Sequence, residues 1–201
     1  MRYLVKTPLL FKLFLPKLIW RKKSDSIFLT FDDGPTNLYT KKILTVLKEQ
    51  DIYATFFCVG ENVKKRPSLY TEIIKQGHAV GNHTMRHLNG WKTSSKEYLL
   101  DIENASKHIK STLFRPPYGK INFRAIRSIR KKYDVIMWDI VGGDFDNNCS
   151  AELVISNVLN NVKAGSIIVL HDNKNFGEKT LAALPKIIEG IKSKNLSFSS
   201  L

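Results

Sequence analysis

Several short apolar runs in this chain are followed by side chains that could take part in catalysis. These side chains stand at the end of each run or a few residues after it. Two adjacent carboxylates, Asp32 and Asp33, stand directly before a Gly-Pro turn. Two imidazoles, His83 and His87, follow at a spacing of four residues. The later groups of this kind are Arg115, the carboxylates Asp139, Asp144 and Asp146, and His171. Carboxylates, imidazoles and a guanidinium are the groups that a hydrolytic site uses.

Asp33, His83 and His87 suit a divalent metal ion. One carboxylate and two imidazoles make a three-ligand site that leaves a position open for water, as catalytic zinc sites do. A bound divalent ion lowers the pKa of that water towards neutrality and polarises a carbonyl group. Each motif alone also has a plainer interpretation, as helix-capping carboxylates after a turn or as a chance pair of surface histidines. Their succession at consecutive predicted strand ends favours a site.

Three further side chains complete a hydrolytic set. Asp32 can take the proton of the water. His171 can return a proton to the leaving group, because histidine titrates near neutral pH. Arg115 can hold Asp32 ionised and oriented through charge-assisted hydrogen bonds. The set describes metal-assisted hydrolysis of an amide or an ester.

These residues can meet only if the fold gathers the ends of its strands. From residue 26 onward, apolar runs alternate with helical periodicities, which predicts a parallel α/β sheet, doubly wound or closed into a barrel. The carboxyl ends of such strands lie on one face. No Gly-rich phosphate loop follows the first strand, which disfavours nucleotide binding. The predicted strands are 27–31, 52–59, 79–82, 113–115, 135–139, 166–171 and 196–199, and the predicted helices are 38–49, 67–76, 95–110, 121–132, 151–163 and 178–193.

The order of the motifs resembles that of a known enzyme family. Thr-Phe-Asp-Asp-Gly-Pro at 30–35, His-Thr-x-x-His at 83–87, Arg-Pro-Pro-Tyr-Gly at 115–119 and Leu-His-Asp at 170–172 are similar to the motifs of polysaccharide deacetylases. These form the NodB-homology group, carbohydrate esterase family four, and the resemblance spans residues 25–195. It implies a distorted (β/α)7 barrel with the active site at the C-terminal ends of the strands. It also implies removal of N-acetyl, sometimes O-acetyl, groups from amino-sugar polymers.

The same resemblance implies a role for each motif residue. A divalent ion, Zn²⁺ or else Co²⁺, Ni²⁺ or Mn²⁺, would be held by Asp33, His83 and His87. Asp32 would be the base, His171 the acid, and Arg115 the residue that orients the base. The main-chain N–H of Tyr118 would help to hold the oxyanion. The residues expected at the substrate are Tyr118, Pro117, Trp138 and Leu170, the last lining a pocket for the acetyl methyl group.

One motif departs from the family pattern Trp-x-x-Asp-x-x-Asp-Trp. Val141 stands at the place of its first aspartate and Phe145 at that of its second tryptophan. The carboxylate that steadies His171 is therefore open: we favour Asp144, then Asp139, with Asp146 as a further candidate. The changed aromatic wall can also alter which sugar fits.

The net charge of +14 comes from two local blocks. Residues 1–23 hold seven basic and no acidic residues, and residues 104–133 hold nine basic and no acidic ones. Such blocks attract acidic membrane surfaces or anionic cell-wall polymers, although a merely solvated surface is an equal alternative. No helix-turn-helix or RNP-like motif accompanies them, so we expect no nucleic-acid partner.

Residues 1–24 are expected to be a basic amphipathic segment that precedes a deacetylase domain over 25–201. Leu9, Leu10, Leu13, Phe14 and Leu18 fall near helical spacing. We favour a segment packed against the domain over a helix lying on a membrane. The stretch is too short and too charged to span a bilayer, and no cleavable signal is evident. A cytoplasmic, membrane-peripheral or exported location stays open.

The leading interpretation is a metal-dependent N-deacetylase of peptidoglycan or a chitin-like oligosaccharide, acting as a monomer. A hydrolase of a small amide, imide or O-acetyl ester on the same fold is one alternative. A carbohydrate- or polyanion-binding module without catalysis is another, and the complete set of reactive residues disfavours it. The two cysteines are expected to be unpaired thiols.

Overall fold

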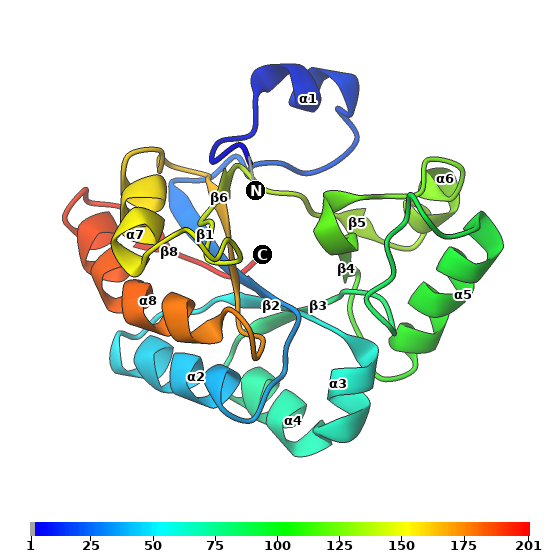
Figure 1. The fold of residues 1–201 in the computed structure, drawn as a ribbon, viewed down its shortest axis with the longest axis horizontal. Helices are drawn as coiled ribbons and strands as arrows, with labels where there is room; N and C mark the ends of the chain where they lie inside the picture. Colours follow the sequence, from blue (N-terminus) through cyan, green and yellow to red (C-terminus); the bar gives the residue numbers. More distant parts are fainter. Residues whose placement is uncertain (1–2) are drawn as a thin grey trace.

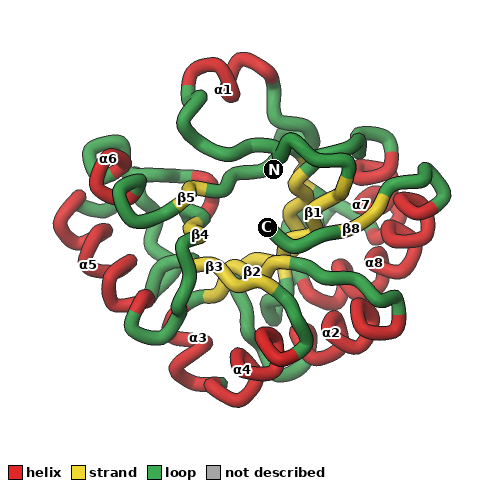
Figure 2. Tube along the Cα trace, turned by 180° about the vertical axis from the view of Figure 1, so that it is seen from behind, coloured by secondary structure: helices red, strands yellow, loops and turns green. Residues whose placement is uncertain are grey.

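The fold is built on a curled sheet of parallel strands with helices on its outer side (Figures 1 and 2). A computed structural model describes residues 3–201. The strand order is β5-β4-β3-β2-β1-β7-β6, with β8 added to β1, and each pair is parallel. The architecture agrees with the expected distorted (β/α)7 barrel. The strands are β1 Ser26–Asp32, β2 Thr55–Cys58, β3 Ala79–Asn82, β4 Leu113–Phe114, β5 Asp134–Val135, β6 Ile140–Val141, β7 Ile167–His171 and β8 Ser197–Phe198.

The central strand, β1, is buried over almost its whole length because its neighbours and the outer helices cover it. Such strands read as continuous apolar runs, as Ile27–Phe31 does apart from Thr30. The helices follow local signals: Ser94 caps α5 by accepting from the N–H of Glu97, and Pro67 opens α4. The helices are α1 Leu9–Phe14, α2 Tyr39–Glu49, α3 Gly60–Lys65, α4 Pro67–Lys75, α5 Ser95–Ser106, the 3₁₀ turn η1 Pro117–Gly119, α6 Ile126–Ile129, α7 Ala151–Leu159 and α8 Gly177–Lys192.

The predicted strand 135–139 is too long. β5 ends at Val135, Ile136 N–H still donates to the carbonyl of Phe114 on β4, and the chain then pairs with the N-terminal segment. The main chain of Ile19 exchanges hydrogen bonds with Val135 and Met137. Further on, Thr7 N–H donates to the carbonyl of Asp139, and Val141 N–H donates to the carbonyl of Val5. The segment thus lies between β5 and β6, the two ends of the curled sheet, and satisfies backbone groups that neither strand reaches.

The predicted helix 121–132 is shorter than expected. α6 covers only Ile126–Ile129. The helical periodicity of 121–132 would place Phe123 on the inner face with Ile126 and Ile129, but its side chain is 58% exposed. Asn122 explains the difference, since its Oδ1 accepts from the N–H groups of Arg124 and Ala125 and holds a turn there. The basic side chains of this stretch are still mostly on the outside.

The predicted strand 52–59 was too long, and α3 was not predicted. The N–H of Ile52 bonds back to Leu47 at the end of α2, and the N–H of Ala54 donates to His78 Nδ1. Strand pairing therefore begins only at Thr55. At the other end, Val59 N–H donates to the carbonyl of Gly34, and the chain turns directly into α3.

The N-terminal segment divides into packed flanks and an exposed helix. Leu18 and Trp20 are buried in the core, whereas no residue of α1 is buried. The flanks therefore pack against the domain as expected. The apolar side chains of α1 do not, and this helix projects from the ring of elements in Figure 1, with Lys12 pairing to Asp139. Arg2, the first basic residue of the block, lies outside the described residues.

Two further sequence expectations concern the thiols and the membrane. Cys58 and Cys149 are both buried and free, as expected. Over residues 3–201, none of the helices combines the length and the apolarity that crossing a bilayer requires.

Candidate active site

The carboxyl ends of β1, β3, β4 and β7 bring the predicted residues to one face of the sheet. Asp32 and His171 are register partners at the ends of β1 and β7. Asn82 and Phe114 are register partners on β3 and β4, so the next residues, His83 and Arg115, leave the sheet side by side. Groups that are up to 139 positions apart in the chain are thereby collected by parallel pairing alone.

Asp33, His83 and His87 form one compact cluster. Asp33 Oδ1 lies 3.0 Å from His87 Nε2 and 3.4 Å from His83 Nε2. One ligand atom from each residue lies within 4.8 Å of the other two. A carboxylate oxygen and two imidazole nitrogens that converge in this way fit a divalent cation of the zinc type.

The second ring nitrogen of each histidine is occupied, which orients the first. His83 Nδ1–H donates to the main-chain carbonyl of Arg115 at 2.7 Å. His87 Nδ1 lies 3.1 Å from the hydroxyl of Tyr118, whose ring meets the imidazole edge-on. Outer partners of this type fix the tautomer and the direction of a metal-ligating histidine. The Nε2 atoms are therefore the ones presented to a cation.

Asp33 is held by two asparagines that sequence reasoning missed. Asn173 Nδ2 donates to Asp33 Oδ2 at 2.6 Å, and Asn62 Nδ2 donates to the main-chain carbonyl of Asp33 at 2.8 Å. Burial alone would raise the pKa of Asp33, but the interactions with His83 and His87 hold this pKa well below its usual range. The carboxylate is thus kept ionised, as a metal ligand must be.

Unusual backbone conformations cluster around these residues. Asp33, Thr84, His87 and Tyr118 have φ between 58° and 82°, a region that residues other than glycine rarely adopt. Gly34 lets the turn after Asp33 approach Asp172 closely, because a Cβ at residue 34 would lie 2.1 Å from Asp172 Oδ2. Local strain of this kind is concentrated at functional sites.

Asp32 is paired with a buried arginine. Arg115 Nη1 lies 2.7 Å from Asp32 Oδ1, and its Nη2 and Nε donate to the main-chain carbonyls of Met137 and Ile136. Burial lowers the pKa of Arg115, and the charge of Asp32 counteracts this. An arginine held by these further partners keeps Asp32 in one orientation.

His171 rests on Asp144. His171 Nδ1 lies 3.0 Å from Asp144 Oδ1, and Asp144 Oδ2 accepts from the main-chain N–H of His171 and from Thr180 Oγ1. Burial by itself would lower the pKa of His171, but the charge and hydrogen bond of Asp144 raise it to about 10. Phe145 and Phe176 pack edge-on against the ring.

Asp139, the second candidate carboxylate, lies elsewhere. Asp139 is fully buried, and its oxygens accept from Lys12 Nζ at 2.5 Å and from Ser166 Oγ at 2.8 Å. Arg21 Nε lies 3.5 Å from the same carboxylate. Asp139 therefore anchors the N-terminal segment and does not contact His171.

The four residues expected at the substrate differ in their accessibility. Tyr118 is 61% exposed beside His87, and Trp138 is half-buried. Pro117 is buried and Leu170 has no exposed surface, and their contact with a substrate stays a prediction. Leu170 packs in the main core, and a Cβ at Gly142 would meet it.

The residues that sequence reasoning missed gave only weak signals. Asn173 directly follows the Leu-His-Asp motif at a strand end, which marks it as polar but not as a partner of Asp33. Asn62 lies in α3, 29 positions from Asp33, and its neighbours carry no pattern that points to the site.

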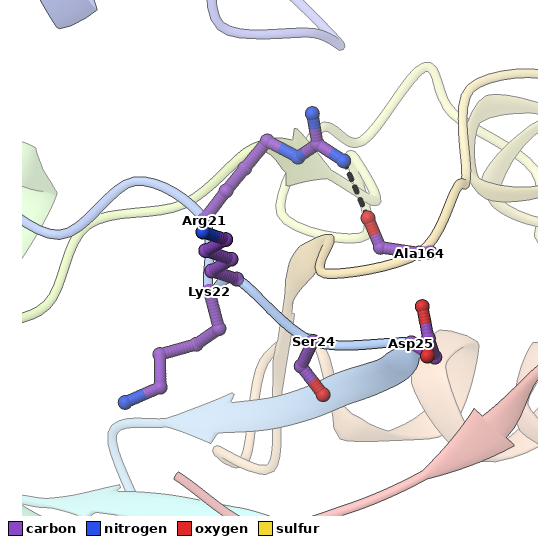
Figure 3. A pocket seen from close by; sticks show the side chains of 6 residues that line it. Arg21, Lys22, Ser24, Asp25 and Ala164 are labelled. Atoms are coloured by element: carbon purple, nitrogen blue, oxygen red, sulfur yellow. Dashed lines mark hydrogen bonds between the residues drawn. The ribbon is translucent and has the colours of Figure 1, made fainter.

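A wide pocket lies at the opposite ends of the strands and contains none of these groups. Its volume is about 570 Å³, and residues 21–25 and Ala164 line it just before β1 and β7 begin (Figure 3). Arg21 crosses it to donate to the carbonyl of Ala164, and Lys22 and Lys23 make it basic. The chemistry therefore belongs to the carboxyl ends of the strands.

A parallel β/α half-barrel with a carboxylate–imidazole cluster, a buried Asp–Arg pair and an Asp-bound histidine at its strand ends defines a hydrolase site. Residues 21–136, more than half of the chain, match the sequence pattern of the polysaccharide deacetylases. The chain belongs to this family, in the group of carbohydrate esterase family four, and is a hydrolase of carbon–nitrogen bonds in linear amides.

Curated relatives and solved structures agree with this assignment. A peptidoglycan-N-acetylglucosamine deacetylase of Bacillus cereus is 35% identical over 179 residues, covering 86% of this chain and 84% of that protein. A chitooligosaccharide deacetylase of Sinorhizobium fredii is 30% identical over 194 residues, covering 88% and 90%. The crystal structure of the Bc1960 peptidoglycan N-acetylglucosamine deacetylase superposes with a TM-score of 0.85 at 30% identity, covering 95% of this chain and 94% of that one.

The fold alone does not establish catalysis. A pseudoenzyme of carbohydrate esterase family four from Bacillus anthracis shares the fold with a TM-score of 0.79 at 24% identity, over 92% of this chain and 68% of that one. Within this fold, activity therefore depends on the reactive residues rather than on the architecture.

Proposed function

We propose that this protein removes N-acetyl groups from an amino-sugar polymer, peptidoglycan or a chitin-like oligosaccharide. One observation carries the proposal: Asp33 Oδ1 faces the Nε2 atoms of His83 and His87 at 3.4 and 3.0 Å. Beside this cluster stands a base candidate, Asp32, already fixed by Arg115. The names of the relatives, which are peptidoglycan and chitooligosaccharide deacetylases, support the substrate class.

Asp33, His83 and His87 would hold one divalent ion, with Zn²⁺ as the first choice and Co²⁺, Ni²⁺ or Mn²⁺ as alternatives. When bound, such an ion supplies Lewis acidity and lowers the pKa of a water molecule towards neutrality. The low pKa of Asp33 and the occupied Nδ1 atoms of both histidines support this donor set.

Asp32 acts as the general base in this proposal. Arg115 binds one of its carboxylate oxygens, Oδ1, and so leaves Oδ2 to accept the proton of the attacking water. The ion pair also fixes the direction of the base in a site where its side chain is only 5% exposed.

His171 acts as the general acid. Asp144 occupies its Nδ1, so Nε2 is the nitrogen that can donate a proton to the leaving amine of the sugar. The raised pKa of His171 keeps the ring protonated at neutral pH. Base and acid are register partners at the adjacent ends of β1 and β7. The main-chain N–H of Tyr118 would help to stabilise the oxyanion.

Acetate release tests the proposal. Purified protein should release acetate from peptidoglycan or from N-acetylglucosamine oligomers, lose this activity with a chelator, and regain it with added zinc or cobalt. His83→Ala should remove both metal and activity, whereas the matched control His108→Ala, outside the site, should change neither. Full activity of chelator-treated, metal-free protein would contradict the proposal. Release of acetate only from O-acetyl esters or small amides would favour the alternative substrates.

A further inference from the structure

A second pocket lies beside the candidate active site. Its volume is about 360 Å³, and one wall comes from the loop before α5 and the other from the turn before α6. The lining residues are Gly90, Trp91, Thr93, Ser94, Ser95, Asn122, Phe123 and Arg124, and there is no acidic side chain among them.

One wall of this pocket follows the candidate metal ligand His87 in the chain, and the other follows Tyr118, which contacts His87. His87 is three residues before Gly90, and its imidazole contacts Tyr118 on the opposite wall. Gly90 N–H donates to the carbonyl of Lys120 at 3.0 Å, two residues after Tyr118. The pocket thus lies on the same two loops that carry His87 and Tyr118, on the side where a polymer bound at Asp33 and the histidines would extend.

The pocket is preformed. Asn122 Nδ2 donates to the carbonyl of Thr93 at 2.8 Å, and Ser95 Oγ lies 3.1 Å from Asn122 Oδ1. A Cβ at Gly90 would lie 2.3 Å from the carbonyl oxygen of Lys120, so only glycine lets the two walls meet. Little conformational entropy would be lost when a ligand binds to walls already tied together.

Its side chains combine exposed aromatic rings with positive charge. Trp91 and Phe123 are 62% and 58% exposed, an unusual placement for large apolar side chains. Aromatic faces carry partial negative charge and suit the C–H face of a pyranose ring. Lys120 Nζ lies 5.4 Å from the centroid of the Trp91 ring, and Arg124 lines the same pocket.

We propose that this pocket is a glycan subsite that binds a carboxylate-bearing sugar next to the sugar being deacetylated. Trp91 and Phe123 stack on the sugar ring, and Lys120 and Arg124 pair with its carboxylate. The inference rests on the proposed function and narrows its substrate class to an anionic glycan rather than a neutral chitin-like chain.

Two variants and two substrates test the subsite. Trp91→Ala should raise KM for both carboxylated glycan strands and neutral N-acetylglucosamine oligomers by about three- to tenfold, the loss of one aromatic contact. Lys120→Gln combined with Arg124→Gln should raise KM only for the carboxylated strands. The KM for these strands should then no longer depend on salt concentration. Arg127→Gln combined with Lys131→Gln, on the same basic stretch but outside the pocket, is the matched control.

Titration calorimetry with the same two glycans separates this inference from the proposed function. The wild type could release no acetate and still bind the carboxylated glycan more tightly than the Trp91→Ala variant does. In that case the deacetylase proposal fails and the subsite stands. Unchanged binding and unchanged KM in both pocket variants would overturn the subsite. Equal losses on both glycans in the Lys120–Arg124 variant would overturn its preference for a carboxylate.

A different observation concerns α1. Its large apolar side chains are 52–75% exposed, and they are Leu9, Leu10, Phe11, Leu13 and Phe14. The helix is nevertheless held in place, since Lys12 pairs with the buried Asp139 and the flanking Leu18 and Trp20 lie in the core. A fixed cluster of exposed apolar side chains marks an interaction surface rather than a frayed end.

The basic side chains around α1 indicate which kind of surface its exposed apolar side chains would bind. Residues 3–24 hold Lys6, Lys12, Lys17, Arg21, Lys22 and Lys23 and no acidic residue, and Lys17, Lys22 and Lys23 are exposed. Apolar insertion together with basic side chains is the combination that binds an anionic lipid surface. We infer that α1 docks the protein on an anionic phospholipid bilayer.

Vesicle co-sedimentation tests the docking. Wild-type protein should pellet with phosphatidylglycerol-containing vesicles, less so at high salt, and hardly with pure phosphatidylcholine. Leu10→Ser, Leu13→Ser and Phe14→Ser together should abolish pelleting, while Leu100→Ser with Leu153→Ser, two exposed leucines elsewhere, should not. Unchanged pelleting of the α1 variant would overturn the inference. So would a wild-type dimer, in sedimentation velocity, that the α1 variant loses, because α1 would then bind a second copy.

Discussion

Arg115 and Asp32 form a buried ion pair in which Nη1 lies 2.7 Å from Oδ1 and the side chains are 0% and 5% exposed. The same guanidinium donates to the main-chain carbonyls of Ile136 and Met137 and to Thr30 Oγ1. It therefore orients the candidate base and also ties β1 to the segment that follows β5. Loss of Arg115 should damage both the site and the fold.

Arg115→Leu should lower the free energy of unfolding by about 3–5 kcal/mol, because it leaves Asp32 as an unpaired buried charge. Arg115→Leu combined with Asp32→Leu should recover part of the loss, since no charge is then stranded. Urea unfolding of the three proteins measures both effects. A loss in the single variant no larger than that in the double variant would show that the pair does not hold the structure together.

Asp144→Asn should move the alkaline limb of the kcat/KM profile to lower pH. Asp144 raises the pKa of His171 to about 10, and an acid catalyst loses activity as the pH rises through its pKa. Without the carboxylate charge, deprotonation and loss of activity should begin at lower pH. Asp134→Asn, at an exposed position, is the control. An unshifted alkaline limb would show that another group is the acid.

The two adjacent carboxylates should separate into base and ligand. Asp32→Asn should keep the metal content and lower kcat by about 10²–10⁴-fold, the usual weight of general-base catalysis. Asp33→Asn should lower the metal content, since its Oδ1 faces both imidazoles. Metal analysis and acetate release on the same samples decide between the roles. The opposite pattern would reverse the two assignments.

Asn173→Ala should weaken metal binding without removing a ligand. Its Nδ2 donates to Asp33 Oδ2 at 2.6 Å, and outer partners of metal ligands typically contribute about 10- to 100-fold in affinity. Competition with a chromogenic chelator measures the affinity. Asn175→Ala, two positions along at an exposed site, serves as the control. Equal affinity in the wild type and the Asn173 variant would mean that the contact does not support the ligand.

His78 should contribute to acid destabilisation. Burial lowers its pKa to about 4, so between about pH 6.5 and 4 the unfolded state binds the proton and the folded state does not. The stability that depends on neutral His78 is therefore lost as the pH falls through this window, by about 2–3 kcal/mol. Urea unfolding at pH 7 and 4.5 should show a smaller loss in His78→Gln than in the wild type. Equal losses would contradict the assignment.

The motif residues and the parallel class could be predicted because each rests on local pattern. The apolar run 27–31 ends in Asp32 and Asp33, and a buried parallel strand followed by polar side chains has few other interpretations. Pro67 before α4 and the Ser94–Glu97 cap of α5 are equally local. Strand-end convergence then follows from parallel pairing.

Errors arose where a distant segment satisfied the backbone. Residues 136–139 have the composition of a strand, and Ile136 and Asp139 still donate main-chain hydrogen bonds to Phe114 and Ile167 of the sheet. Their other main-chain partners are Ile19 and Thr7 from the N-terminal segment, so the strand does not continue as one element. In the predicted helix 121–132, the side chain of Asn122 binds the following N–H groups and holds a turn in place of the first helical turn. Phe123 is exposed as a result. Local hydrophobic periodicity indicates neither the N-terminal segment nor the Asn122 side chain as a hydrogen-bond partner of these backbone groups.

The sequence by itself determined which side chains could do chemistry, their order along parallel strands, and the family to which they point. Only the tertiary structure decided that Asp144 faces His171 while Asp139 holds Lys12, and that Asn173 reaches Asp33. The physical reason is that apolar periodicity reports which face of an element is buried. The partner of a buried polar group instead depends on how loops far apart in the chain are placed around the ends of the strands.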